Sequence, residues 1–328
     1  MALMGALLLT VANSSTAHLT LQADDFVPGR AWERELELPI PTREIVLSWD
    51  ARAPRGSSLT FSLRAPGTKA YNMGSWSETE SLRRSFNGQK DEQGDVQTDI
   101  LVLREPTQKI WIRVEPTGDA VLRRVDLSLR NPDGCTRPAR GNRSAWGRVI
   151  PVPKRNQGAY ANGNVICSPT TVSMMLQYWA GVLEQPFLDQ DVPLVQSGVF
   201  DPEWGGTGNW SFNAAFAARM GLRSFVTRLD SVEEAEQFIA MGVPVVTSVS
   251  YDLLKGKPER GENDGHLVIL VGFDADGTPV FNDPGRSNQL QHRYERAAFD
   301  RAWASSGRTA YVIAPPKTRL PKISGMKW

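Results

Sequence analysis

The sequence predicts two domains in series: an all-β domain of the sandwich or jelly-roll type, followed by an α+β domain. Three observations support this prediction. The chain has 328 residues, about twice the length of a typical single domain. Residues 19–130 contain short runs of alternating polar and apolar residues, broken by Pro and Gly and without helical periodicity. From residue 149 onward, helical patterns alternate with apolar strands, which is typical of an α+β fold.

Within the first domain, we expect five strands. They cover residues 44–49, 58–63, 98–103, 109–114 and 124–129, and we expect the polar stretch 76–97 to form loops. The domain also holds Trp32, Trp49, Trp76 and Trp111. Tryptophans pack well in a core but can also bind sugars. We therefore predict a core role for them and keep a carbohydrate or cell-surface ligand as the alternative.

The second domain is expected to span residues 149–316. Its predicted helices cover 169–180, 211–220 and 231–241, and its strands cover 243–249, 266–273, 278–282 and 311–314. Residues 131–148 mix Pro, Gly, Asn and Arg, a composition typical of a linker. The basic, Pro-containing tail 317–328 is expected to be loosely held.

The composition excludes several classes of protein. With 41% hydrophobic and 22% charged residues, the chain is neither mostly disordered nor a polytopic membrane protein. Its net charge of +1 shows no basic bias of the kind that nucleic-acid binding requires. Two cysteines and three scattered histidines exclude a Cys-rich zinc site. No phosphate-binding loop is present, so we expect no cofactor and no metal.

The N-terminal residues suggest export. Residues 3–12 form an apolar run that is too short to span a bilayer, which takes about 20 residues, but has the length of a signal-peptide core. Ser15-Thr16-Ala17 offers a small-x-small cleavage site. We therefore predict a signal peptide over residues 1–17, a secreted or periplasmic protein and no stable membrane insertion. Because no Lys or Arg precedes the run, a buried strand is the alternative.

Cys167 is the better placed of the two cysteines for chemistry. It precedes Ser168-Pro169, a pair that favours a helix start with Ser168 as N-cap. The free N–H groups and the dipole at a helix N-terminus stabilise a thiolate and can bind an oxyanion. A buried structural cysteine and a disulfide to Cys135 are the alternatives.

A histidine with a carboxylate partner strengthens the catalytic hypothesis. His266 opens a predicted strand, and the return strand after the turn 274–277 carries Asn282 and Asp283. If Phe273 faces Thr278, the pairing places Asp283 on the face of His266. A one-residue bulge would select Asn282 instead. Either side chain would orient the imidazole toward a nucleophile. His18 lies at the predicted signal junction, and we expect His292 at the surface.

Four segments carry a family resemblance, in order and at suitable spacing: Pro151–Gln157, Cys167–Leu176, Gly265–Phe273 and Asn282–Pro284. They resemble a papain-like cysteine peptidase of the bacteriocin-processing, double-glycine-leader type, in its free-standing secreted branch without transporter domains. The likeness spans residues 149–314, although Ser168 stands where the family usually has Gly. It implies a papain-like fold with Cys167 as nucleophile, His266 as general base and acid, Asp283 as its orienting residue and Gln157 in the oxyanion hole.

The predicted activity is hydrolysis of peptide bonds, through an acyl-thioester on Cys167, in a peptide or protein substrate. Trp204 and Trp210 flank a Gly-rich loop and are candidates for the substrate cleft, with core packing as the alternative. Two other functions stay open: a transglutaminase-like or cell-wall amidase acyl transferase with the same triad, and a non-catalytic binding protein.

Overall fold

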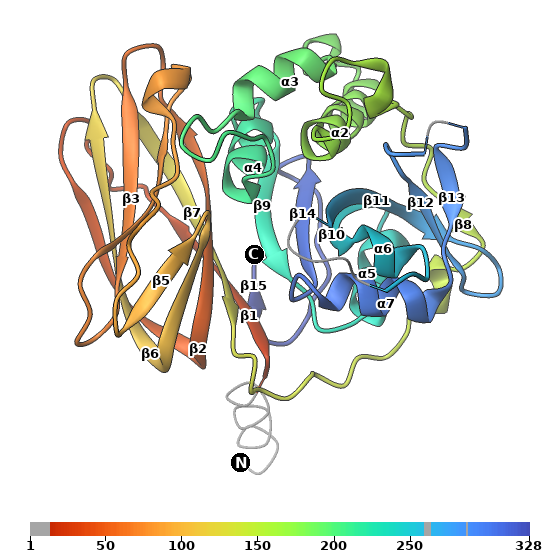
Figure 1. Cartoon of the computed structure of the whole chain (residues 1–328), viewed down its shortest axis with the longest axis horizontal. Coiled ribbons are helices and arrows are strands. Elements are labelled where there is room, and N and C mark those ends of the chain that lie inside the picture. The colour runs from red at the N-terminus through yellow and green to blue at the C-terminus, as the bar shows by residue number, and fades with distance from the viewer. Residues whose placement is uncertain (1–13, 259–263, 287) are drawn as a thin grey trace.

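Two β-sheets, each in its own lobe, form the framework of the molecule (Figure 1). The computed structural model describes residues 14–258, 264–286 and 288–328. The apolar run 3–12 therefore lies outside the described residues. The strands of the first lobe are β1 (Thr16–Gln22), β2 (Trp32–Arg52), β3 (Ser58–Arg64), β4 (Tyr71–Trp76), β5 (Gly94–Gln97), β6 (Ile100–Thr117) and β7 (Val121–Arg130), joined by β15 (Met326–Lys327).

The first lobe differs from the predicted sandwich in its connectivity. Its eight strands belong to a single sheet in the order β15-β1-β7-β2-β6-β3-β4, with β5 also paired to β6. The two strands predicted at 98–103 and 109–114 are one continuous strand, β6. Its pairing with β2 shifts register around Thr42, and these irregularities absorb the Pro-containing interruption. Strands β1, β4 and β5 were not predicted; the first residues of β1 fall within the predicted signal peptide.

Three of the four tryptophans of this lobe are core residues. Trp32, Trp49 and Trp76 are buried, and Trp49 stacks on Phe61 with ring centroids 4.0 Å apart. Trp111 is half-buried under the Arg64 guanidinium, 4.1 Å from its ring. The core interpretation is confirmed for the first three.

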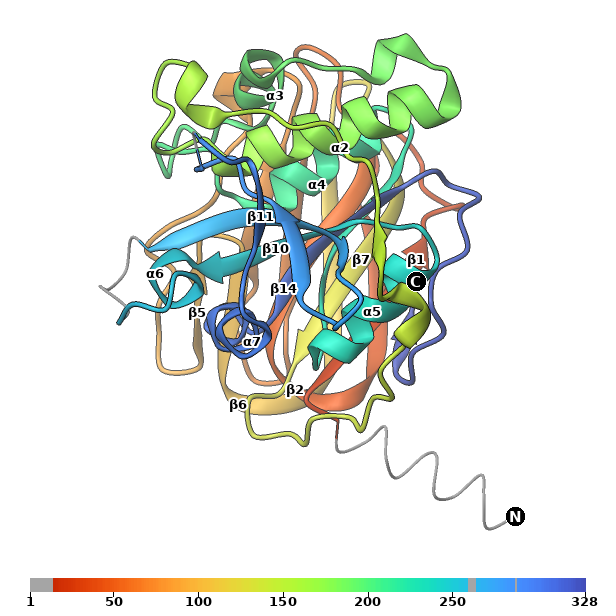
Figure 2. The same cartoon turned by 90° about the vertical axis from the view of Figure 1, so that its right-hand side faces the viewer.

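The second lobe is built on an antiparallel six-stranded sheet in the order β13-β12-β11-β10-β14-β9. The strands of this sheet are β9 (Arg223–Arg228), β10 (Val245–Ser250), β11 (Gly265–Phe273), β12 (Pro279–Asn282), β13 (Gln291–Arg293) and β14 (Thr309–Ala314). The short strand β8 (Arg148–Val149) also belongs to the lobe. Its helices are α2 (Cys167–Leu183), α3 (Val192–Val199), α4 (Trp210–Arg219), α5 (Val232–Ala240), α6 (Tyr251–Leu254) and α7 (Arg296–Ala304). Figure 2 shows α2, α3 and α4 on one side of the sheet and α5 and α7 on the other. The α+β prediction is confirmed.

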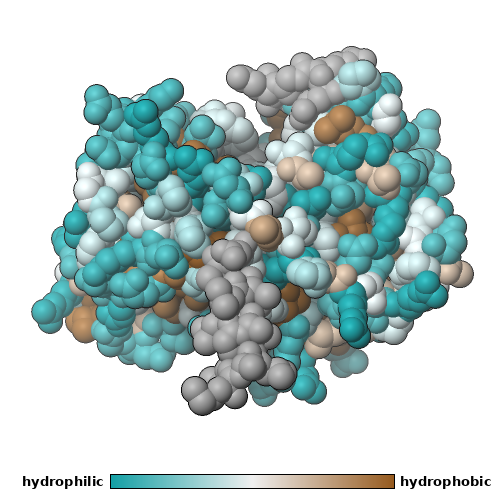
Figure 3. All heavy atoms as spheres, turned by 90° about the horizontal axis from the view of Figure 1, so that it is seen from below, coloured by the Kyte–Doolittle hydropathy of each residue, from teal (hydrophilic) through white to brown (hydrophobic). Residues whose placement is uncertain are grey.

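The two lobes pack directly against each other through α4 and β9. The Ser211 hydroxyl donates to the Leu47 carbonyl at 2.5 Å, and the Val226 amide donates to Ser48 Oγ at 2.9 Å. The buried Arg83 guanidinium donates to two carbonyls of the second lobe, those of Ser197 and Phe200. The first sheet is therefore a wall of the second lobe. The outer surface is mostly hydrophilic where the two lobes are seen from below (Figure 3).

The segment predicted as a linker is packed against the second lobe. Arg137 is buried and donates to the Glu234 carboxylate at 3.0 Å. The Asn142 amide and the Trp146 indole both donate to Glu236 on α5. Buried ion pairing of this kind anchors a segment, because a charge taken out of water must keep its partner.

The expectation of a loosely held tail is wrong. Strand β15 pairs in parallel with β1, where Met326 is the partner of His18. The Trp328 ring lies against His18, Phe225 and Phe238, at centroid distances of 5.7, 6.0 and 5.4 Å. The apolar contacts of this tryptophan outweigh the basic, Pro-containing sequence before it.

The predicted signal boundary falls inside a strand. Ser15 and Thr16 donate hydrogen bonds to the Asp230 carboxylate at 2.6 and 2.8 Å, and Ala17 is buried in β1. A cut after Ala17 would remove these residues from the sheet. His18 is fully buried beside Asp126, and burial lowers its pKa. Across the described residues, no helix has the length and apolarity to cross a bilayer.

The Trp328 contacts lead to a stability prediction. Trp328→Ala should lower the free energy of unfolding by about 2 kcal/mol, the scale of burying one large apolar side chain. Urea denaturation measures the change. Lys327→Ala is the control, because Lys327 is exposed on the same strand. Equal effects of the two substitutions would contradict a specific role for the Trp328 ring.

Candidate active site

Cys167 is the first residue of α2. Ile166 occupies the N-cap position, so the helix begins one to two residues earlier than the Ser168-Pro169 signal predicts. Pro169 still fits, because N–H groups in the first helical turn have no intrahelical acceptor. Ser168 turns inward instead of capping the helix, and its Oγ lies 3.0 Å from the Tyr311 hydroxyl. The helix N-terminus thus carries the half-buried sulfur, as the sequence indicates.

His266 connects Cys167 to a carboxylate. Its Nε2 lies 2.8 Å from Asp283 Oδ1, and His266 and Cys167 are near enough for each to shift the pKa of the other. Both His266 and Asp283 are buried. The chain Cys167–His266–Asp283 therefore spans helix α2, strand β11 and the end of strand β12.

The selection of Asp283 over Asn282 follows from two irregularities in the β11–β12 hairpin that cancel. Phe273 pairs with Pro279, not with Thr278, so the turn is one residue longer than predicted. A bulge between Leu270 and Gly272 then restores the predicted pairing, with Ile269 opposite Asn282. Asn282 points elsewhere and donates to the Val152 carbonyl at 2.9 Å. The bulge does not select Asn282, because the longer turn offsets it.

Asp283 and His266 have aromatic neighbours that sequence analysis did not identify. The Tyr294 hydroxyl donates to Asp283 Oδ2 at 2.5 Å, and the Gly285 amide donates to Oδ1 at 2.9 Å. The Tyr251 ring lies against the imidazole, with centroids 4.0 Å apart. No spacing rule signals these tyrosines, because α6 and the segment after β13 reach the site only through the tertiary fold.

The electrostatics favour a charged Cys–His pair. Burial by itself would raise the pKa of the Cys167 thiol, but hydrogen bonds from His266 and from the Leu267 and Ser168 amides lower it overall. Burial would lower the pKa of His266, yet Asp283 and Cys167 raise it to about 9. Burial opposes ionisation of Asp283 too, and His266 and Tyr294 keep the pKa of its carboxyl below the usual value. These shifts favour a thiolate and an imidazolium over the neutral thiol and imidazole.

Gln157 lies in a short 3-10 turn, Gln157–Ala159, beside the loop that follows Asp283. Its amide N–H donates to the Pro284 carbonyl at 3.1 Å, and its side chain is buried. The side-chain Oε1 has no hydrogen-bond partner among the described residues. A Cβ on Gly163 would come within 2.4 Å of the Gln157 carbonyl, so this close approach requires glycine.

Trp204 and Trp210 occupy different environments. Trp204 is 47% exposed and covers Gly206 and Gly208. Its loop lies beside the residues before Cys167, since Thr207 Oγ1 donates to the Val165 carbonyl at 3.2 Å. Trp210 begins α4 and lines a pocket between the two lobes.

The remaining candidates for chemistry are now placed. Cys135 is an exposed free thiol, so a disulfide to Cys167 is not formed. His292 is half-buried beside Tyr294, with ring centroids 4.5 Å apart, and is therefore less exposed than predicted. Within the described ranges, no group of three His, Cys, Asp or Glu side chains is arranged to hold a metal ion.

Comparison with protein families covers both lobes. A model described as Peptidase C39 like family matches residues 149–311, the segment that contains Cys167, His266 and Asp283. The protein is a cysteine-type peptidase. A second model, Peptidase C39 N-terminal domain, matches residues 6–129 of this peptidase. No curated protein and no solved structure matches the chain.

The pKa shifts predict early alkylation of Cys167 as pH rises. Since its thiol pKa is lowered, the thiolate is populated above that lowered value, and iodoacetamide should label Cys167 at a lower pH than Cys135. His266→Ala removes the stabilising imidazolium, so the midpoint should rise to or above the ordinary thiol value of about 8.5. Mass spectrometry of the labelled peptides across pH gives the midpoint of Cys167 labelling in the wild-type protein and in the variant. Identical midpoints for Cys167 in the two proteins would contradict the ion pair.

Proposed function

We propose that Cys167, His266 and Asp283 form the catalytic triad of a peptidase that works through an acyl-thioester intermediate. The observation that supports this proposal is that His266 is hydrogen-bonded to Asp283 at 2.8 Å and interacts electrostatically with Cys167 at the start of α2. The thiolate attacks the peptide carbonyl, and the carbonyl π electrons move to oxygen. The imidazolium then protonates the leaving amine as the C–N bond breaks. Neutral His266 next removes a proton from water, which attacks the thioester and releases the acid and the thiol.

The oxyanion of the tetrahedral intermediate needs hydrogen-bond donors that are already in place. We assign this role to the Gln157 side-chain amide and the Cys167 backbone N–H, which lies at a helix N-terminus where N–H groups have no intrahelical acceptor. The buried position of Gln157 beside the loop that follows Asp283 supports this assignment, since its backbone N–H donates to the Pro284 carbonyl at 3.1 Å.

We further propose that the protein is a free-standing, exported enzyme of the double-glycine-leader type. The four segments that resemble this branch all lie in the matched region 149–311. The apolar run 3–12 supports export. Because Ser15 and Thr16 are bonded to Asp230, we place signal cleavage before Ser14 instead of after Ala17.

An active-site probe tests the triad. Cys167→Ala and His266→Ala should each lower peptide cleavage by at least about 10³-fold, since triad members act as a unit. Cys135→Ser is the matched control and should retain both labelling and cleavage, because Cys135 is exposed outside the site. A peptide-library digest read by mass spectrometry measures activity. Full activity of Cys167→Ala would refute the assignment.

The same digest separates hydrolysis from acyl transfer. With an added primary amine, a peptidase should yield mainly free carboxylates, whereas a transglutaminase-like enzyme would yield amides from the shared thioester. Predominant amide products would replace the hydrolytic proposal with the transferase.

Export has its own test. Expression in a host that exports proteins should yield extracellular or periplasmic protein whose N-terminus is Ser14 or a residue before it. N-terminal sequencing reads the position. An intact Met1 in exported material would contradict a cleaved signal, and a start at His18 would contradict the placement upstream of β1.

A further inference from the structure

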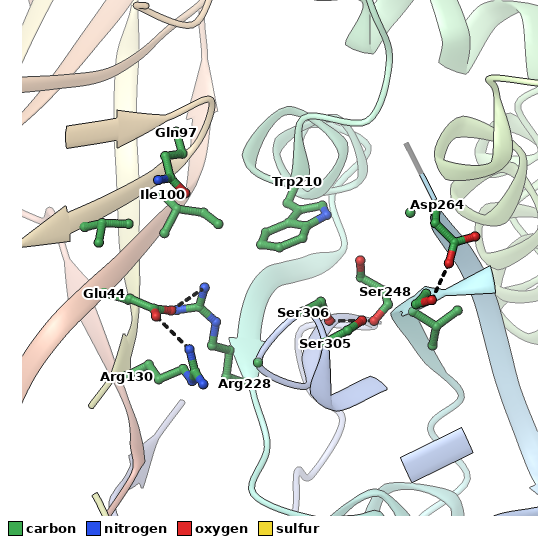
Figure 4. A pocket seen from close by; sticks show the side chains of 15 residues that line it. Glu44, Gln97, Ile100, Arg130, Trp210, Arg228, Ser248, Asp264, Ser305 and Ser306 are labelled. Atoms are coloured by element: carbon green, nitrogen blue, oxygen red, sulfur yellow. Dashed lines mark hydrogen bonds and ion pairs between the residues drawn. The ribbon is translucent and has the colours of Figure 1, made fainter. Parts of the chain in front are cut away.

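A pocket of about 630 Å³ lies between the two lobes, and both contribute to it (Figure 4). The first lobe supplies Glu44, Arg130 and Ile100, and the second supplies Trp210 and Arg228. The size is that of pockets that hold small molecules or side chains. No step of the proposed mechanism uses these groups.

The pocket adjoins the proposed catalytic histidine through the β10–β11 ladder. Val249 and Ser250 line the pocket, and they pair with His266 and Gly265 respectively. Gly265 itself is exposed and also lines the pocket. The pocket therefore lies beside the strand that carries His266, on the neighbouring residues of the same ladder.

The charges at the first-lobe side of the pocket do not balance. The Glu44 carboxylate forms ion pairs with both arginines. Arg130 Nη1 lies 2.6 Å from Oε1, and Arg228 Nη2 lies 3.3 Å from Oε2. Figure 4 shows the two guanidinium groups converging on this single carboxylate. Two cations share one carboxylate at this side, while the second carboxylate of the lining, Asp264, lies across the pocket.

The arginines also keep unused donors. Arg228 is 1% exposed, and its Nη1 has no hydrogen-bond partner among the described residues. Burial lowers the pKa of Arg228 to about 10, which indicates a charge that its surroundings do not fully compensate. The Arg130 side chain is 28% exposed and faces the pocket. An uncompensated buried guanidinium favours the approach of a carboxylate.

Two further carboxylates, Asp264 and Asp99, lie near the pocket, and among the described residues neither forms an ion pair with Arg130 or Arg228. Asp264 receives the Ser250 hydroxyl and the Asp252 amide across the pocket from the arginines. Asp99, behind Trp210, is buried, and burial raises its pKa to about 7 although the Trp210 amide donates to it. Asp99 is thus only partly ionised at neutral pH.

We propose that this interlobe pocket binds a carboxylate of the peptide substrate through Arg130 and Arg228, so that the N-terminal lobe takes part in substrate selection. The apolar walls Ile100, Val102 and Trp210 suit the methylene stem of such a residue. This inference rests on the proposed peptidase function. The source of the carboxylate is an acidic side chain or a free chain terminus, and the test separates the two.

Matched peptides provide the test. In substrates identified by the library digest, Glu is replaced by isosteric Gln at each position near the cleaved bond, and both are made with free and amidated C-termini. Wild-type enzyme should cleave the Glu peptide with a kcat/KM at least about 10-fold higher at one position, because a charge-assisted hydrogen bond is lost with Gln. If preference instead follows the free terminus, the pocket binds the terminal carboxylate.

Variants link the preference to the pocket. Arg130→Gln and Arg228→Gln should each reduce the Glu-to-Gln ratio several-fold. Arg43→Gln is the matched control, since Arg43 is on β2 beside Glu44 but pairs with Asp133 outside the pocket. Probe labelling of Cys167 checks that each variant keeps a folded site. If Arg228→Gln does not fold, the Glu-to-Gln ratio of Arg130→Gln compared with that of the wild-type enzyme still tests the role of the pocket.

The outcomes separate the two proposals. Cleavage without any Glu-to-Gln or terminal-carboxylate preference, or a preference that Arg130→Gln leaves intact, overturns the pocket proposal and leaves the peptidase assignment standing. Absence of cleavage from every library peptide, together with unlabelled Cys167, overturns the proposed function.

Discussion

The opposite pKa shifts of Cys167 and His266 depend on partners from several elements of the second lobe. A buried thiolate and imidazolium are costly unless each has fixed partners. The fold supplies them from separate elements: amides of Ser168 and Leu267 for the sulfur, and Asp283 for the imidazole. Asp283 is in turn held by Tyr294 and Gly285. Helix α2, strand β11 and the end of β12 must therefore keep their relative positions, and the packing of α2 against β11 fixes them.

The N-terminal lobe extends this rigidity. Its Asp99 carboxylate accepts the Trp210 amide at the start of α4, and its Leu47 carbonyl accepts the Ser211 hydroxyl one residue later. The helix that borders the interlobe pocket is thus capped and held by a neighbouring sheet. A lobe attached in this way acts as a structural part of the enzyme, in contrast to an accessory module on a flexible tether.

The sequence predicted the elements of the second lobe better than those of the first. The helices around Cys167 and after Ser231 and the β11–β12 hairpin have clear local patterns and all are present, although only the Ser231 cap was predicted correctly. The partnership of Asp283 with His266 was predicted from the strand pairing of the β11–β12 hairpin. That pairing is correct near His266 only because a longer turn and a bulge cancel. The single sheet of the first lobe, Tyr251 and Tyr294 were missed, since long-range pairing and packing leave no local periodic pattern. The packing of the C-terminal tail was missed because it depends on one residue, Trp328, whose ring contacts Phe225 and Phe238.

Strand β1 sits between β7 and β15, so the sheet of the first lobe is completed by residues about 300 positions later in the chain. During synthesis, β1 and β7 can pair early, but the place of β15 stays empty until the whole second lobe has emerged. The exposed edge of β1 is a site for wrong pairing in that interval. Closure by β15 therefore waits for the last residues of the chain, so this edge of the first sheet is covered only after the second lobe has been synthesised.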